Sequence, residues 1–122
     1  MRIVLVEPQK KAVIRNIDGT PETMQCIVGG PIQAVYPFSE PVALICNDEG
    51  KLMNLPMNRA LRDADGAVYD IVNGTFFLCA APPDSSCFEG LSNEQARTYA
   101  ERFSVPEIFL NVGEALLILP LL

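Results

Sequence analysis

The sequence contains no histidine among its 122 residues, and this absence limits the chemistry that the chain can perform. Histidine is the side chain whose ordinary pKa lies nearest neutral pH, so any general base here must be a carboxylate, lysine, cysteine or tyrosine. No Ser-His-Asp or Cys-His arrangement can be built. Carboxylates do occur in pairs, Asp48 with Glu49 and Asp63 with Asp65, but neighbouring charges in a turn are usually solvated. We therefore predict that the protein is not an enzyme.

Spacings typical of metal and phosphate sites are also missing. The run Asp63-Ala64-Asp65-Gly66 invites comparison with a calcium loop, but that alignment puts Leu61 and Val72 where carboxylates are required. A weak cation site at the two aspartates of this run and Asp70 is the alternative that remains. No G-x-G-x-x-G or G-K-S/T run occurs, and Gly29-Gly30 follows a predicted helix instead of opening one. We expect no cofactor and no structural metal.

The four cysteines, Cys26, Cys46, Cys79 and Cys87, show no C-x-x-C spacing. Without histidine, residues this dispersed do not favour a zinc site. Cys26, Cys46 and Cys79 lie in apolar runs, where cysteine usually behaves as a small buried hydrophobe. Cys87 lies in a polar loop and is expected to be exposed. We favour four reduced thiols over disulfides.

Basic residues are few, nine against fifteen acidic ones, which gives a net charge of −6. An acidic surface repels phosphates, so nucleic acid is not an expected partner. The acids are scattered, whereas mimicry of DNA needs dense carboxylate rows. The opening MRIVLVEP is too short for a signal-peptide core, and the closing ALLILPLL is far below the roughly 20 residues of a membrane span. These features predict no membrane contact and a cytoplasmic location.

The patterns that are present predict one domain over residues 1–122 with an α+β fold. We expect a small, mainly antiparallel sheet with two helices and a C-terminal hairpin. Thr20 and Pro21 start the first helix and Gly29 ends it, while Ser92 and Gln95 form a capping box for the second. Strands are predicted over 2–6, 12–17, 32–38, 41–47 and 75–81, with short turns joining the first two and the next two.

Two hairpins are predicted in the second half of the chain. Asn73-Gly74, between apolar runs, is a strong hairpin signal that would pair 67–72 with 75–81. The alternative is a single helical turn over 69–72 that ends at Gly74. Gly113 separates two further apolar runs, 107–112 and 114–119, and their apolarity suggests burial of this terminal hairpin against the main sheet.

The stretch Leu44 to Arg62 is the candidate working surface. It passes from a core strand, through an Asp-Glu-Gly turn, into a polar loop with Asn54, Asn58, Arg59 and Arg62 as candidate ligand or partner contacts. Arginine forks suit carboxylate or phosphate groups of a partner. The alternative, which we favour, is that Arg59 pairs internally with an aspartate at 63, 65 or 70 and pins the loop to the sheet.

A family resemblance covers nearly the whole chain and rests on five ordered blocks: MRIVLVEP, VGGPIQAVYPFSEPVALICNDEGKL, LPMNRALRDADG, YDIVNGTFFLCA and PEIF…LP. In these blocks the chain resembles the domain of unknown function 3846 family, whose members are encoded largely by phages, plasmids, conjugative elements and Gram-positive gut bacteria. The resemblance implies no established activity, cofactor or substrate. Its genetic context suggests an accessory or counter-defence role. It also implies a small residue near 53–54, where this chain has Met53 and Asn54.

Three functional hypotheses follow. The first is a small, non-enzymatic binding or interaction protein of mobile-element origin, acting on a host or element-encoded protein. The second is a small-ligand-binding protein or minor enzyme that uses residues 54–62 as the pocket wall. The third is a structural role through self-association, for instance as a dimer, by the apolar terminal hairpin.

Overall fold

The computed structural model describes all 122 residues and is built around a five-stranded antiparallel sheet. The strand order is β2-β1-β7-β4-β3. The bounds are β1 (Arg2–Val6), β2 (Val13–Asn16), β3 (Ile32–Val35), β4 (Val42–Asn47) and β7 (Phe76–Ala80). The predicted pairings of β1 with β2 and of β3 with β4 are confirmed. The α+β prediction is likewise confirmed, with two helices and a C-terminal hairpin.

The two central strands explain why their sequences are apolar throughout. Every residue of β4 and every residue of β7 is buried, because each strand has neighbours on both sides and packed layers on both faces. The sequences of such strands are continuous apolar runs and do not alternate between apolar and polar residues. Leu44 to Asn47 is therefore part of a core strand, as the sequence predicted.

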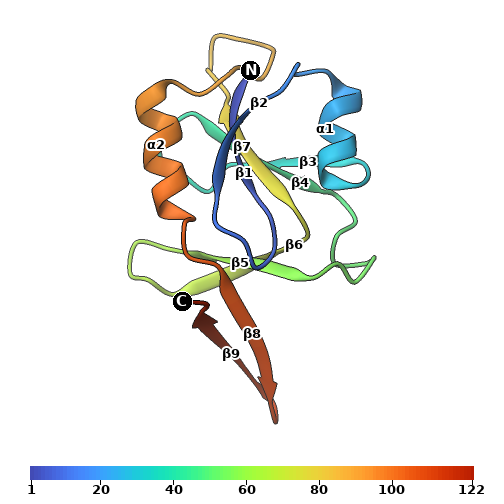
Figure 1. Cartoon of the computed structure of the whole chain (residues 1–122), viewed down its shortest axis with the longest axis vertical. Coiled ribbons are helices and arrows are strands. Elements are labelled where there is room, and N and C mark those ends of the chain that lie inside the picture. The colour runs from blue at the N-terminus through green and yellow to red at the C-terminus, as the bar shows by residue number, and fades with distance from the viewer.

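The first helix, α1 (Pro21–Val28), covers one face of the sheet (Figure 1). The hydroxyl of Thr20 accepts a hydrogen bond from the amide of Thr23 at 3.2 Å, and Pro21 occupies the first turn, where its missing N–H leaves no bond unmade. Gly29 ends the helix with a φ of 81°, in the left-handed region. The core on this face consists of Ile3, Met24, Val28, Ala43, Ile45, Phe77 and Cys79.

A second layer covers the opposite face and combines α2 (Asn93–Arg102) with the two-stranded sheet of β5 (Met57–Arg62) and β6 (Val68–Asn73) (Figure 1). The predicted capping box of α2 is present, with both the Ser92 and the Gln95 side chains bonded to backbone amides. Residues from every part of this layer join one apolar cluster with the sheet, among them Leu61, Val72, Ala96, Tyr99 and Phe103.

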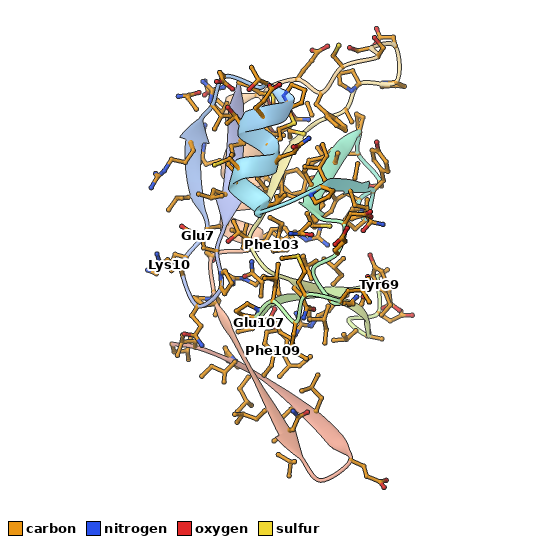
Figure 2. The ribbon with its side chains drawn as sticks, turned by 90° about the vertical axis from the view of Figure 1, so that its right-hand side faces the viewer. Glu7, Lys10, Tyr69, Phe103, Glu107 and Phe109 are labelled. Carbon is orange, nitrogen blue, oxygen red and sulfur yellow. The ribbon has the colours of Figure 1, made fainter.

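The last two strands, β8 (Glu107–Val112) and β9 (Ala115–Pro120), form the predicted terminal hairpin, but its predicted burial against the main sheet is wrong. The hairpin extends away from the body of the molecule and pairs with no other strand (Figures 1 and 2). Both faces of the main sheet are already covered by the helices and by β5–β6. The apolar side chains of the hairpin consequently remain half-buried or exposed.

Three further predictions are corrected. Asn73-Gly74 does not join a hairpin, and 69–72 is not a helical turn, because β6 pairs with β5 while β7 pairs with β1 and β4. The supposed polar loop is a strand from Met57 onward. Cys26 is exposed, whereas Cys46 and Cys79 are buried and Cys87 is exposed as predicted. All four thiols are free.

Neither helix has the length and apolar composition needed to span a membrane.

Candidate functional site

A β-bulge directs two polar residues of β5 into the interior. Met57 lies opposite Asn73 and Arg59 opposite Val72, so Asn58 is an additional residue on the β5 side of the pair. A bulge of this kind changes the direction of the side chains beside it. As a result Asn58 and Arg59 are both buried, with exposed fractions of 0% and 1%.

The side chain of Asn58 links three parts of the chain. Its amide nitrogen donates to the carbonyl oxygens of Val6 and Gly74, both at 2.9 Å, and its oxygen accepts from Arg59 Nη1 at 2.9 Å. These bonds use both N–H groups and the carbonyl oxygen of the amide. Asn58 therefore holds β5 to the end of β1 and to the turn before β7.

Arg59 extends the same network. Its Nη2 donates to the carbonyl oxygen of Lys10 at 2.7 Å and to that of Phe103 at 2.9 Å, while Nη1 also donates to the carbonyl of Asn58 at 3.2 Å. Phe103 is the C-terminal cap of α2, so the guanidinium binds a free carbonyl at the negative end of the helix. Burial lowers the pKa of Arg59 and the nearby Glu107 opposes that effect, yet an arginine stays charged in proteins.

Asn58 and Arg59 thus serve as an internal brace, and we refer to these two residues as the brace. The expected structural role of Arg59 is present, but its predicted partners are wrong, because it bonds three backbone carbonyls and the side-chain oxygen of Asn58, and not the aspartates at 63, 65 or 70. Only Nε of Arg59 lacks a partner, and that atom is itself buried. With these groups occupied, the brace does not offer the ligand contacts that the sequence suggested.

Asn54 is a turn residue. It adopts a φ of 55° in the left-handed region, and its amide donates to the carbonyl of Lys51 at 3.1 Å. Asparagine tolerates this conformation better than other non-glycine residues do. The small residue expected near 53–54 thus corresponds to a backbone requirement. Gly50, in contrast, has no positive φ, but an added Cβ would come within 2.8 Å of the carbonyl oxygen of Asn73.

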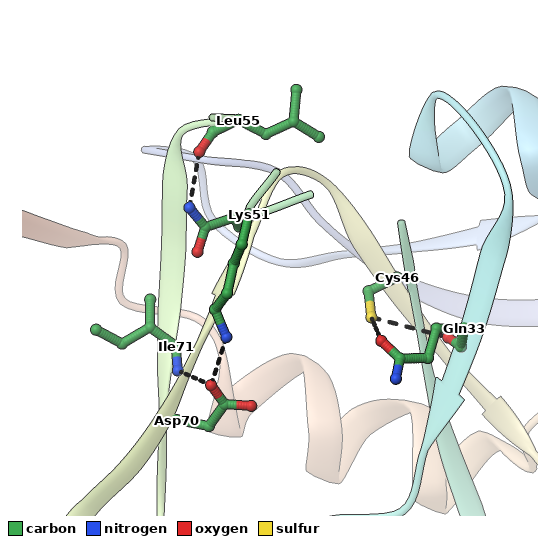
Figure 3. Close-up of polar contacts among 7 residues, drawn as sticks. Gln33, Cys46, Lys51, Leu55, Asp70 and Ile71 are labelled. Carbon is green, nitrogen blue, oxygen red and sulfur yellow. Dashed lines mark hydrogen bonds and ion pairs between the residues drawn. The ribbon is translucent and has the colours of Figure 1, made fainter. Parts of the chain in front are cut away.

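The aspartates of the candidate cation site are engaged separately. Asp63 accepts from the amides of Asp65 and Ala67 at 2.9 and 3.0 Å within its own turn. Asp70 pairs with Lys51 at 2.6 Å and accepts from the amide of Ile71 (Figure 3). Burial alone would raise the pKa of Asp70, but the Lys51 and amide hydrogen bonds outweigh it and lower the pKa. No group of three potential ligand side chains gathers anywhere in the chain.

A hollow of about 160 Å³ lies beside this ion pair and includes Cys46. The Cys46 thiol is directed at Gln33, 3.8 Å from its backbone oxygen and 4.0 Å from its side-chain oxygen (Figure 3). Burial and the nearby Asp48 and Asp70 raise the pKa of this thiol. Since the thiolate is the nucleophile, a thiol held in its neutral form is a poor one.

The larger opening is a groove of about 390 Å³ between the β5–β6 layer, the end of α2 and the base of the hairpin. Glu107 and Phe109 lie at that base, beside the β5–β6 layer (Figure 2). We call this opening the basal groove. Its lining comprises Pro37, Phe38, Arg59, Ala60, Leu61, Arg62, Asp63, Tyr69, Arg102, Phe103, Val105, Glu107, Ile118 and Pro120.

The charge of the basal groove differs from that of the whole chain. Three of the nine basic residues line it, against only Asp63 and Glu107, although the chain carries a net charge of −6. Arg62 bonds Glu107 at 2.9 Å while 42% of its side chain stays exposed. The exposed Arg102 lies over the Phe38 ring, 4.8 Å from its centroid, which is cation–π distance. The groove therefore offers two accessible guanidinium groups beside aromatic surface.

Of the four candidate residues, only Arg62 lies on an accessible, concave surface. The structure does not bring Asn54 to that surface, and it buries Asn58 and Arg59. Tyr69, which is 56% exposed, and Arg102 were missed by the sequence reasoning. Arg102 was at the polar end of a predicted helix, and nothing in the order of residues indicated that this end meets β5.

Comparisons with known proteins identify a family without assigning an activity. No curated protein and no solved structure matches the chain. One family match spans residues 1–104, from the first strand to just past the end of α2, and leaves out the terminal hairpin. The chain belongs to the family described as domain of unknown function (DUF3846).

Proposed function

We propose that this protein is a non-enzymatic interaction protein whose basal groove binds an acidic segment of a partner protein. The observation that carries the proposal is the placement of Arg62 and Arg102, both exposed, on the two sides of one groove in an otherwise acidic chain. Guanidinium groups bind carboxylates in a bidentate manner, and the adjoining Tyr69 and Phe38 supply apolar contact area. Long-range repulsion disfavours acidic partners elsewhere on the surface, so the groove directs the encounter.

The absence of a reactive pair supports a binding role over catalysis. Glu107 is held by Arg62 and by the amide of Ala60, at 2.9 and 3.0 Å. Burial raises the pKa of Cys79 to about 12, and burial with the Glu40 hydrogen bond raises that of Tyr99 to about 12. Groups with such pKa values stay protonated near neutral pH and are poor general bases.

A host or element-encoded protein is the partner class we propose, in an accessory role for a mobile element. Four free thiols suit a reducing compartment, so we place the encounter in the cytoplasm. A small ligand held by residues 54–62 is disfavoured because Asn58 and Arg59 are occupied by internal bonds.

Fluorescence anisotropy with labelled peptides tests the proposal. A peptide of alternating glutamate and leucine should bind, with an affinity that falls as salt rises, and its glutamine–leucine counterpart should not. Replacing Arg62 and Arg102 together by glutamine should weaken binding at least about tenfold. Arg97→Gln is the matched control, since Arg97 is an exposed arginine of α2 outside the groove. Equal binding of both peptides, or an equal loss with Arg97→Gln, contradicts the proposal.

A further inference from the structure

One face of the β8–β9 hairpin is entirely apolar. The register places Ile108 opposite Leu119, Leu110 opposite Leu117, and Val112 opposite Ala115. Side chains alternate between the two faces of a strand, so these three pairs share one face. We call it the apolar face, and its members are Ile108, Leu110, Val112, Ala115, Leu117 and Leu119.

This face is directed away from the body of the protein. The opposite face carries Glu107, whose carboxylate bonds β5, and it contributes Ile118 and Pro120 to the basal groove. Along β9, Leu116 and Ile118 of the opposite face are half-buried. Ala115, Leu117 and Leu119, which belong to the apolar face, are exposed. Four members of the apolar face remain 43–54% exposed: Leu110, Val112, Leu117 and Leu119.

At the base of the hairpin the apolar face continues into a hollow. The amide of Leu121 donates to the carbonyl of Pro106 at 2.8 Å, which extends the strand pairing by one step on the same face. Beyond it lies an opening of about 340 Å³. Its lining residues are Lys11, Ser104, Val105, Pro106, Leu121 and Leu122, of which Lys11 alone is charged.

The total surface of the chain is larger than its mass predicts. A folded monomer of 13.3 kDa should expose about 6450 Å², whereas this chain exposes 7219 Å². The excess over the whole surface, about 770 Å², is of the order of the roughly 800 Å² that each partner buries in a standard protein interface. A two-stranded ribbon is also marginally stable in water unless something covers it.

We propose that the apolar face packs on the same face of a second copy of this chain, the two being related by a twofold axis. Between Ile108 and Val112, and from Ala115 to Leu122, the hairpin carries no charged residue. Two copies of charge −6 repel each other, and their repulsion is smallest where they meet through an uncharged surface. A twofold axis between the Ile108–Leu119 and Leu110–Leu117 pairs sets each face against its own copy, as an isologous interface requires.

The ends of the face set the relative direction of the two hairpins. An antiparallel arrangement puts the tip of one hairpin into the hollow of the other, so that Val112 and Ala115 meet Val105 and Leu121. It also brings Glu114, the only charge at the tip, toward the Lys11 of the second copy. A parallel arrangement would set the two Glu114 carboxylates side by side, where like charges repel.

Light scattering after size-exclusion chromatography, over a concentration series, tests the association. The unmodified protein should have the mass of two copies, and the double variant L110D/L117D that of one, with a dissociation constant raised at least about a hundredfold by the buried carboxylates. N111D is the matched control, since Asn111 is an exposed residue on the opposite face. Circular dichroism should show the same folded body in all variants.

Charge reversal tests the direction. E114K and K11E should each weaken the dimer about five- to tenfold, and the combined variant E114K/K11E should restore it. Several results overturn the proposal: a monomer at every concentration, a dimer that survives L110D/L117D, or an unmodified monomer that binds phosphatidylcholine vesicles through this face. Peptide binding by the basal groove should persist in L110D/L117D, so failure of one proposal is distinguishable from failure of the other.

Discussion

Replacing Arg59 by methionine should lower the free energy of unfolding by about 3–5 kcal/mol. The substitution keeps a long apolar side chain but removes the guanidinium. The oxygens that it binds, in Lys10, Asn58 and Phe103, then lose their donor inside the protein. Each buried acceptor without a partner costs about 1–3 kcal/mol, and release from the cost of burying a charge offsets part of the sum.

Urea unfolding followed by far-UV circular dichroism measures this loss. Domains of this size usually unfold with about 5–15 kcal/mol, so the variant should remain folded but with a much smaller margin. At roughly 2.1 cal/mol/K per residue, the same change lowers the melting temperature by about 12–20 °C. An unchanged dependence on urea concentration would show that the loss lies in stability and not in the extent of unfolding.

Arg62→Met is the matched control. Arg62 lies on the same strand, but 42% of its side chain is exposed, and its partner Glu107 keeps the hydrogen bond from the amide of Ala60 when Arg62 is lost, so its loss should cost no more than about 1 kcal/mol. If Arg59→Met also costs under about 1 kcal/mol, or if the two variants lose equal stability, the brace does not hold the fold together.

Three further outcomes are expected. Burial and the Glu40 hydrogen bond raise the pKa of Tyr99 to about 12, whereas an unfolded tyrosine ionises near pH 10. The stability of the fold should therefore fall as pH rises from about 10 to 12. Thermal melts across this range should show that Tyr99→Phe removes the loss. Asn54→Ala should cost about 1 kcal/mol in urea because of its positive φ, whereas Asn54→Gly should cost nothing; equal losses would contradict the backbone explanation. Ser92→Ala should lower the unfolding free energy by about 1 kcal/mol by removing the bond to the amide of Gln95, and unchanged stability would contradict a role for the cap.

The elements that could be predicted are those set by neighbouring residues. Thr20, Pro21 and Gly29 supply the cap, the first turn and the stop of α1 within ten residues, and all three act as expected. β4 and β7 could be recognised because strands buried on both faces are apolar throughout.

The elements that could not be predicted depend on distant parts of the chain. β5 was interpreted as a loop because the bulge at Asn58 breaks its alternation and Pro56 stands directly before it. The burial of Arg59 depends on carbonyls 49 and 44 residues away, and no local pattern carries that information. The Asn73-Gly74 turn predicted a hairpin that does not form, because β1 and β4 already pair with the two edges of β7. Of the candidate site, only Arg62 could be named from the sequence.

The brace also constrains the order in which the chain can fold. The Arg59 guanidinium has its partners only when the β1–β2 turn, β5 and the C-terminal cap of α2 have already come together. Contacts between such distant residues carry a high entropic cost of loop closure and form late. The brace should therefore be absent from the folding transition state, and its removal should speed unfolding while leaving the folding rate nearly unchanged. Arg59 in that case lengthens the lifetime of the native state by slowing unfolding, whatever partner the protein binds.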